Sequence, residues 1–388
     1  MPAKGENVDA DVVIVGGGVI GTAIAWRAAL HGLDVILVDP DNDKDKASLV
    51  AAGMLGPVSE TVFGEQDLLS LNLLSITRFP GFTEELEAAS GHVTGLRTEG
   101  TLAVAYDGDD LAALKRLTAF RHSIGLAATE LDGRRCRDLE PFLAPGTRGG
   151  VLATGDLSVD NRRYLAALKE AARKSGVRTV QGAVTGLWPR DGHIEVLVRE
   201  AGVPHEPSRR LSAPQVVVAA GWATATIDGV PDQVRNALRP VKGQILRLRH
   251  PRGMPPVATR TIRATVGGRD VYIVPRADGE VVVGATQEER DDTDATAGAV
   301  HDLLRDAMTA LPAISELILA EVSVGLRPGS QDNGPIVGHT DIAGLIVAAG
   351  HFRNGILLSA ATADAVTALL TGKQPAGEWA PFTPGRLR

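Results

Sequence analysis

The stretch DVVIVGGGVIG, residues 11–21, decides the fold of this chain. Its β-branched run ahead of Gly16 predicts a buried strand, and a helix predicted over residues 22–31 follows and ends before a glycine. A second apolar strand, DVILVDP at residues 34–40, completes a strand–helix–strand unit. Because both strands are apolar on both faces, we expect them to be parallel neighbours in a Rossmann-type sheet.

The glycines of this stretch fit a phosphate-binding loop. Gly16, Gly18 and Gly21 follow the G-x-G-x-x-G pattern, in which the glycines allow a tight turn, the approach of a pyrophosphate and close helix packing. Asp39 lies 18 positions after Gly21, close to the usual distance of about 20 for an acid that binds a ribose diol. The pattern does not separate NAD from FAD, and Asp39 argues only against a 2′-phosphate.

Bulk composition is that of a globular protein of two or three domain-sized units. The 388 residues are 44% hydrophobic and 22% charged, and the formal net charge of −7 disfavours a nucleic-acid partner. Cys136 is the sole cysteine, which excludes an internal disulfide and fits a reducing cytoplasm. We also expect no membrane span, no signal peptide and no metal ion.

Further along the chain, buried strands ending in glycine alternate with strands that read as antiparallel. The segments GQILRLRH, VYIVPR and EVVVGAT are of the second kind, and ADG joins the last two as a hairpin turn. We therefore expect a mixed α/β (α+β) fold, with a Rossmann-type cofactor domain interleaved with an antiparallel-sheet substrate domain. The expected ranges are 8–90, 145–225 and 325–388 for the first domain, and 91–144 and 226–324 for the second.

A second small-residue segment, ASLVAAGMLGP at residues 47–57, is not needed for NAD and lets a backbone lie along a large flat ring. Together with GGGVIG, VYIVPR, GLRPGSQDNGPIVG and AAGHFRNGILLS, it resembles the FAD-dependent D-amino-acid-oxidase superfamily. Within that superfamily, the chain is most similar to the glycine oxidases of thiamin (thiazole) biosynthesis. The resemblance runs over residues 11–370, and AAGML and GHFRNGILL are its specific parts.

The resemblance implies which residues bind FAD. Besides the three motif glycines, they are Val19, Ile20, Asp39, Pro40, Ala47, Ser48, Ala52, Gly53, Met54, Val184, Gly221, Phe352, Asn354, Gly355, Ile356, Leu357 and Leu358. Val184 is expected near the adenine, and Trp222 is either a contact or a packing residue.

The C-terminal turn HFRNG lies between an apolar strand and an apolar helix. A helix beginning after Gly355 is predicted by the apolar spacing of Ile356 and the residues that follow it. Its N-terminal N–H groups are expected to face the flavin, where they stabilise negative charge on the ring. Arg353 is then expected on the substrate side, whereas His351 is read either as a satisfied turn histidine or as a site residue.

Two further side chains are expected in the substrate pocket. An arginine fork binds a carboxylate through two parallel hydrogen bonds, and the resemblance places this clamp on Arg327, with the Tyr272 hydroxyl beside it. The chain departs from the family at Gln287 and Asp270, which are expected to make the pocket more polar. It departs again at Asn161, where proline is common.

The expected activity is FAD-dependent oxidation of glycine, or another very small amino acid, to the imine and glyoxylate, with O₂ reduced to H₂O₂. The alternatives are a D-amino acid dehydrogenase, a sarcosine-type secondary amine oxidase, and a flavin- or nucleotide-binding protein without turnover or an RNA-modifying module. The resemblance further implies a role in thiamin biosynthesis and a homotetramer.

Overall fold

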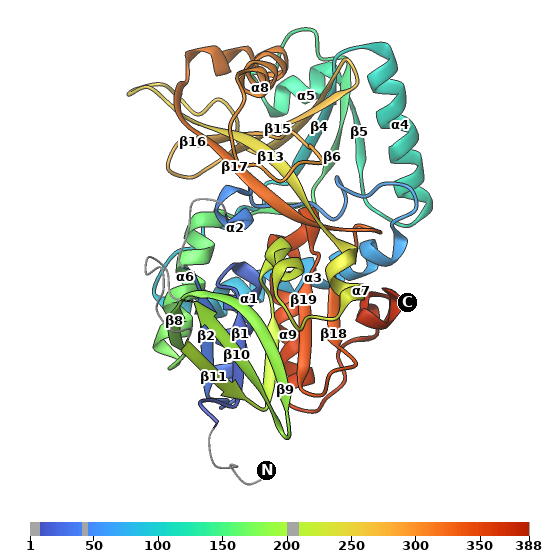
Figure 1. Ribbon diagram of the computed structural model, residues 1–388. Helices are drawn as coiled ribbons and strands as arrows, with labels where there is room; N and C mark the ends of the chain where they lie inside the picture. The colour runs from blue at the N-terminus through green and yellow to red at the C-terminus, as the bar shows by residue number, and fades with distance from the viewer. Residues whose placement is uncertain (1–7, 41–45, 200–208, 388) are drawn as a thin grey trace.

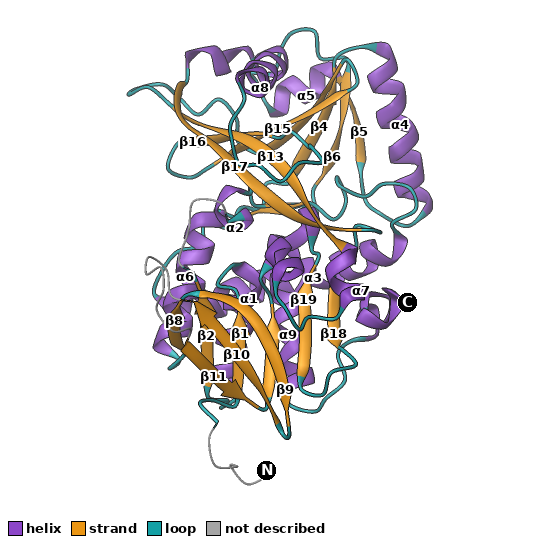
Figure 2. Cartoon of the chain, in the orientation of Figure 1, coloured by secondary structure: helices purple, strands orange, loops and turns teal. Residues whose placement is uncertain are grey.

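The computed structural model of the protein describes residues 8–40, 46–199 and 209–387, which fold into two lobes (Figure 1). Each lobe is built on one large sheet, and helices cover these sheets (Figure 2). In the described part, no helix is both long enough and apolar enough to cross a bilayer.

The lower lobe in Figure 1 contains a six-stranded sheet. Its strands are parallel except at the edge, where β18 runs against β19. In spatial order they are β18 (Ile336–His339), β19 (Leu345–Ala349), β12 (Gln215–Val218), β1 (Val12–Val15), β2 (Val35–Asp39) and β8 (Arg178–Gln181).

Both faces of this sheet are buried, because alternate residues of β1 enter two different cores. Val12 and Ile14 pack under helices, while Val13 and Val15 pack against a three-stranded antiparallel sheet. The helices are α1 (Val19–Leu30), α3 (Gln66–Ser90), α6 (Asn161–Lys174) and α9 (Gly355–Leu370). The small sheet comprises β9 (Ala183–Arg190), β10 (His193–Arg199) and β11 (Arg209–Ala213).

The upper lobe contains an eight-stranded sheet. Its strands, in spatial order, are β17 (Ile318–Ser330), β13 (Leu238–Arg249), β16 (Glu280–Gly284), β15 (Arg269–Pro275), β14 (Thr261–Val266), β4 (Thr101–Ala105), β6 (Gly149–Ala153) and β5 (Thr129–Asp132). Neighbouring strands are antiparallel except for the parallel pair β14 and β4. The helices of this lobe are α4 (Gly108–Ser123), α5 (Gly133–Leu139) and α8 (Ala297–Ala310), and α8 packs on the core of the sheet.

Short elements lie where the two lobes meet or at the surface of the lower lobe. They are α2 (Ala47–Val50), β3 (Met54–Leu55), β7 (Leu157–Ser158), η1 (Gly221–Thr226), α7 (Asp232–Ala237), η3 (Phe352–Asn354), η4 (Gly377–Phe382) and η5 (Pro384–Leu387). The short helix η2 (Pro312–Glu316) follows α8 in the upper lobe and shares its core.

The expected mixed fold, with a Rossmann-type sheet and a second sheet, is confirmed. The first helix begins at Val19 rather than at residue 22, because the glycine loop leads directly into its first turn. Strand β6 pairs in the upper sheet, although it lies inside a segment expected in the cofactor domain. The division of the chain into two domains stays a prediction.

Candidate cofactor and substrate site

The predicted phosphate loop joins β1 to α1 at the carboxyl edge of the parallel sheet. A Cβ on Gly21 would lie 1.9 Å from the Gly16 carbonyl oxygen, so only glycine allows this approach of loop and helix. Gly18 caps α1 in an extended conformation without a side-chain hydrogen bond, and the first turn of α1 contains no acidic residue. The positive end of this helix is therefore suited to an anion.

Asp39 reaches back to this loop from the end of β2. Its Oδ2 accepts a hydrogen bond of 2.6 Å from the Gly17 N–H, and its Oδ1 lies 2.5 Å from Lys46 Nζ. The carboxylate is thus placed beside the loop, where an acid that binds a ribose diol is expected. Its contact with Gly17 shows a second task that the spacing alone did not reveal, namely holding the glycine loop in shape.

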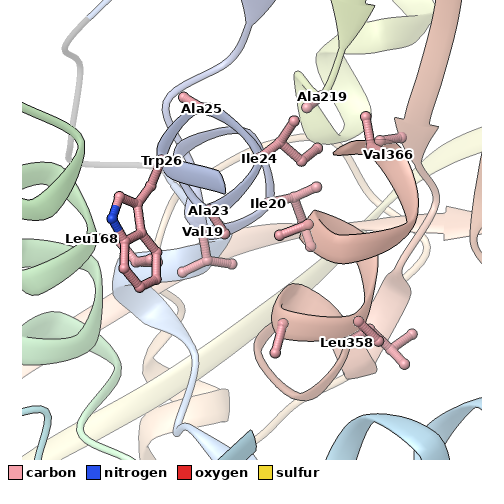
Figure 3. Packing of buried hydrophobic residues seen from close by; sticks show 14 of the residues in the cluster. Val19, Ile20, Ala23, Ile24, Ala25, Trp26, Leu168, Ala219, Leu358 and Val366 are labelled. Carbon is pink, nitrogen blue, oxygen red and sulfur yellow. The ribbon is translucent and has the colours of Figure 1, made fainter. Parts of the chain in front are cut away.

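The N-terminus of α9 lies beside α1 in the same core. Figure 3 shows Ile20 of α1 directed at α9, with Leu358 and Val366 on the facing helix. Asn354 precedes α9 without a side-chain cap, and the first turn of α9 also lacks an acidic residue. The positive N-terminal ends of α1 and α9 therefore lie in one core. This arrangement fits a ligand that has a pyrophosphate and an electron-accepting ring.

The small-residue segment predicted to line the flavin lies between the two lobes. Ala47 and Ser48 begin α2, and Ser48 Oγ accepts a 3.0 Å hydrogen bond from the Val19 N–H at the start of α1. Ala52 and Met54 pack in one cluster with Tyr272 of the upper sheet. This segment is therefore in contact with both the phosphate loop and the candidate substrate pocket.

The turn ahead of α9 has an unusual backbone. Phe352 is buried and has a φ of 46°, in the left-handed region that side chains other than glycine rarely occupy. Arg353 makes an ion pair with Glu65, and its guanidinium lies over the Phe352 ring, 5.8 Å from the centroid. The expected substrate role of Arg353 stays a prediction, because in this structure a carboxylate of the chain already binds it.

His351 is fully buried, and its Nε2 lies 3.0 Å from Thr362 Oγ1. Burial lowers the pKa of the imidazole to about 3, so it is neutral in the folded protein near pH 7. This agrees with the reading of His351 as a satisfied turn histidine and not as a cation at the site.

The buried imidazole predicts a pH dependence of stability. Below pH 6.5 the unfolded chain binds a proton that folded His351 does not, so the free energy of unfolding falls by up to about 1.4 kcal/mol per pH unit. We expect His351→Gln to reduce this slope between pH 6.5 and pH 4, as measured by urea unfolding. The same change at exposed His301 is the control. An unchanged slope in His351→Gln would show that the imidazole titrates normally.

Arg327 on β17 and Tyr272 on β15 are separated in the upper sheet by β13 and β16, and a glycine on each of these two strands makes room for one of them. A Cβ on Gly243 would lie 2.3 Å from Arg327 Nη1, and one on Gly284 would lie 2.4 Å from the Tyr272 hydroxyl. Burial raises the pKa of the Tyr272 phenol, while the Arg327 guanidinium opposes this shift. The hydroxyl is therefore a neutral donor near a cation, as a carboxylate site requires.

The Arg327 guanidinium has free donors. Its Nη1 donates to the carbonyl oxygens of Thr286, at 3.1 Å, and Lys242, at 3.4 Å. Among the described residues no carboxylate pairs with it, and Nε and Nη2 make no hydrogen bond. The half-buried fork is thus held by one nitrogen and can offer the other two to a ligand.

Of the three positions that depart from the family pattern, Gln287 and Asp270 are exposed, whereas Asn161 is buried. Gln287 follows Thr286, whose carbonyl Arg327 binds, whereas Asp270 accepts a 2.9 Å hydrogen bond from Thr265. Asp270 lies two residues before Tyr272 on β15 and so points to the same face of the sheet. Their contribution to the pocket stays a prediction.

The remaining predicted cofactor residues lie around the same sheet edge. Val184 is half-buried on β9, Pro40 is exposed after β2, and Gly221 begins η1 with a φ of 60°, next to half-buried Trp222. Gly53 is buried, with a φ of 71°. Ile356 and Leu357 are buried in the core shared with α1, and Gly355 is the first residue of α9.

Sequence reasoning missed the charged loop at residues 57–65. Its backbone is held by Asp156, which accepts hydrogen bonds of 2.9 Å and 3.1 Å from the N–H groups of Val58 and Ser59. Glu60 forms an ion pair of 2.7 Å with Arg263, and Arg263 lies opposite Tyr272 on the neighbouring strand. The loop therefore adds a carboxylate to the surroundings of Tyr272. The motifs on which the family resemblance rests contain neither Glu60 nor Arg263, so they did not indicate this pair.

Comparison with known proteins places this site in context. The model of the DAO family, described as FAD dependent oxidoreductase, matches residues 11–369. Glycine oxidase of Geobacillus kaustophilus is 33% identical over 377 residues, which is 96% of each chain. Its crystal structure superimposes with a TM-score of 0.86 and covers 96% of this chain and 98% of the other.

A second group of relatives is longer than this chain. The bifunctional protein ThiO/ThiG of Synechocystis is 31% identical over 382 residues, which is 97% of this chain but 54% of the relative. The chain thus spans about half the length of the first curated relatives that it matches.

Proposed function

Because the chain belongs to the DAO family of FAD-dependent oxidoreductases, we propose that it oxidises glycine, or another very small amino acid. One observation carries this proposal. The Arg327 guanidinium donates to the chain through Nη1 alone, and it lies near the neutral Tyr272 hydroxyl and the Ala52–Met54 segment. The relatives named glycine oxidase support the same substrate class.

In this proposal the substrate carboxylate binds the free nitrogens of Arg327 and the Tyr272 hydroxyl. These contacts orient the substrate Cα–H toward the small-residue segment, and orientation of this kind lowers the activation barrier of the chemical step. Bound FAD supplies two-electron oxidation of the C–N bond, with O₂ reduced to H₂O₂. Water then converts the imine to glyoxylate and ammonia. His351 is not proposed as a base, because burial lowers the pKa of its imidazole and its Nε2 lies against Thr362.

We propose the same binding residues for FAD as the resemblance implies. The α1 N-terminus holds the pyrophosphate through the N–H groups other than that of Val19, which donates to Ser48, Asp39 accepts from the ribose, and the first turn of α9 faces the ring. We further propose that the imine serves thiazole formation in thiamin biosynthesis, and that the protein is a cytoplasmic homotetramer. Light scattering after size exclusion tests the oligomer.

A substrate panel with peroxide detection tests the activity. We expect glycine to bleach the flavin absorbance without air, and to give one H₂O₂ per glyoxylate in air. Sarcosine, D-alanine and larger D-amino acids are the comparison set. Faster turnover of a larger D-amino acid would contradict the small-substrate proposal. Flavin that is bleached by glycine but reoxidised by air only over minutes would point instead to a dehydrogenase.

A further inference from the structure

One buried amide links the predicted flavin segment to both lobes. Asn161, the first residue of α6, is fully buried. Its Nδ2 donates a 2.8 Å hydrogen bond to the carbonyl oxygen of Ser48. Its Oδ1 accepts from Arg276 Nη2 at 3.2 Å and from Arg247 Nη2 at 3.4 Å. A single side chain thus connects α6, α2 and the upper sheet.

The two arginines bind the same segment directly. Arg247 Nη2 donates to the Leu49 carbonyl oxygen at 3.1 Å, and Arg276 Nη2 donates to the carbonyl oxygen of Ala52. Arg276 Nη1 also donates to the Val159 carbonyl oxygen at 2.7 Å. The carbonyl groups of Ser48 and Ala52 are therefore held by Asn161 and by Arg276, which Asn161 contacts, while the Leu49 carbonyl oxygen accepts from Arg247 and also from Arg162 Nε at 3.2 Å.

Helix formation does not account for this asparagine. Asp160 is the N-cap of α6, and its carboxylate accepts from the N–H groups of Arg162 and Arg163. The Asn161 side chain takes no part in the cap, and the first position of a helix suits proline. The buried amide therefore serves its contacts to the segment at residues 48–52.

We propose that Asn161 is a positioning residue, which sets the backbone of residues 47–54 in the conformation that receives the flavin before the cofactor binds. The proposal rests on the cofactor site proposed above. A segment that is ordered in advance loses less conformational freedom on binding, so affinity rises. Without the amide, the Ser48 carbonyl oxygen and the two guanidinium groups lose a buried partner.

The test uses Asn161→Pro in the full-length protein. Proline should be accepted, because the first helical position needs no N–H for an intrahelical hydrogen bond and Asp160 before it has an extended backbone rather than a helical one. Asn161→Ala removes the same contacts without proline. The control is Glu140→Gln, because Glu140 is equally buried but binds Thr259 and Arg260 in the upper lobe.

Two measurements on apoprotein distinguish the outcomes. We expect hydrogen exchange of the amides at residues 47–54 to accelerate, and the Kd for FAD to rise about tenfold, in both Asn161 variants but not in Glu140→Gln. Unchanged exchange, or faster exchange with an unchanged Kd, would overturn the proposal. If wild-type protein bound FAD but did not oxidise glycine, the proposed activity would fail while this positioning role still stood.

Discussion

Arg327→Ala is expected to lower kcat/KM for glycine by about 30-fold to 1,000-fold, which corresponds to about 2–4 kcal/mol of transition-state binding. The substitution removes the fork whose free nitrogens are proposed to hold the substrate carboxylate. Arg327→Lys should recover part of the loss, because a lysine keeps the charge but not the two parallel hydrogen bonds. Steady-state peroxide assays over a range of glycine concentrations provide the measurement.

Two comparisons make this result specific. Arg269→Ala removes an exposed arginine from β15 of the same sheet, where it pairs with Asp306, and should leave kcat/KM within about twofold of wild type. For a primary amine without a carboxylate, kcat/KM should be nearly the same in wild type and Arg327→Ala, because such a substrate does not bind the Arg327 guanidinium. Near-wild-type kcat/KM for glycine in Arg327→Ala would remove this residue from the substrate site.

The fold was predictable where local pattern and burial agree. The run VVIV, the glycine loop and VILVD gave the parallel pair β1 and β2, since such strands need apolar residues on both faces. The helix α3 was missed, although Leu68, Leu71, Phe79, Phe82 and Leu86 are buried at helical spacing. Pro80 lies inside this helix, where proline usually marks an end.

The parts of the site that lie within one short motif could be predicted from the sequence. Contacts between segments far apart in the chain could not. Asp39 lies 22 positions after Gly17, so the motif spacing predicts an acid beside the glycine loop, although not its hydrogen bond to the Gly17 N–H. Glu65 and Arg353 are 288 positions apart, and Asn161 and Ser48 are 113 apart. Such pairs depend on the packing of α3 and α6 in the lower lobe, which no local period encodes. A charged residue in a loop therefore gave no sign of its partner.

Gly18→Val is expected to yield folded protein that binds FAD much more weakly and purifies with less than stoichiometric flavin. Gly18 has a φ of −76° and a ψ of −177°, an extended backbone that valine also adopts. A Cβ there meets only Ser48 Oγ, at 3.1 Å, so the apoprotein should tolerate it. The rest of the valine side chain would fill the space over the α1 N-terminus that the pyrophosphate is proposed to occupy. Lost backbone hydrogen bonds to an anion, at about 1.5–3 kcal/mol each, would raise the Kd about 100-fold.

The ratio of flavin to protein absorbance after purification, and titration of apoprotein with FAD, measure this effect. Gly298→Val is the matched control, because its Cβ would lie in open space on α8, in the other lobe. Thermal unfolding of both apoproteins should stay close to wild type, which separates a blocked cofactor site from a misfolded loop. Stoichiometric flavin in purified Gly18→Val would show that the pyrophosphate does not bind at this helix end.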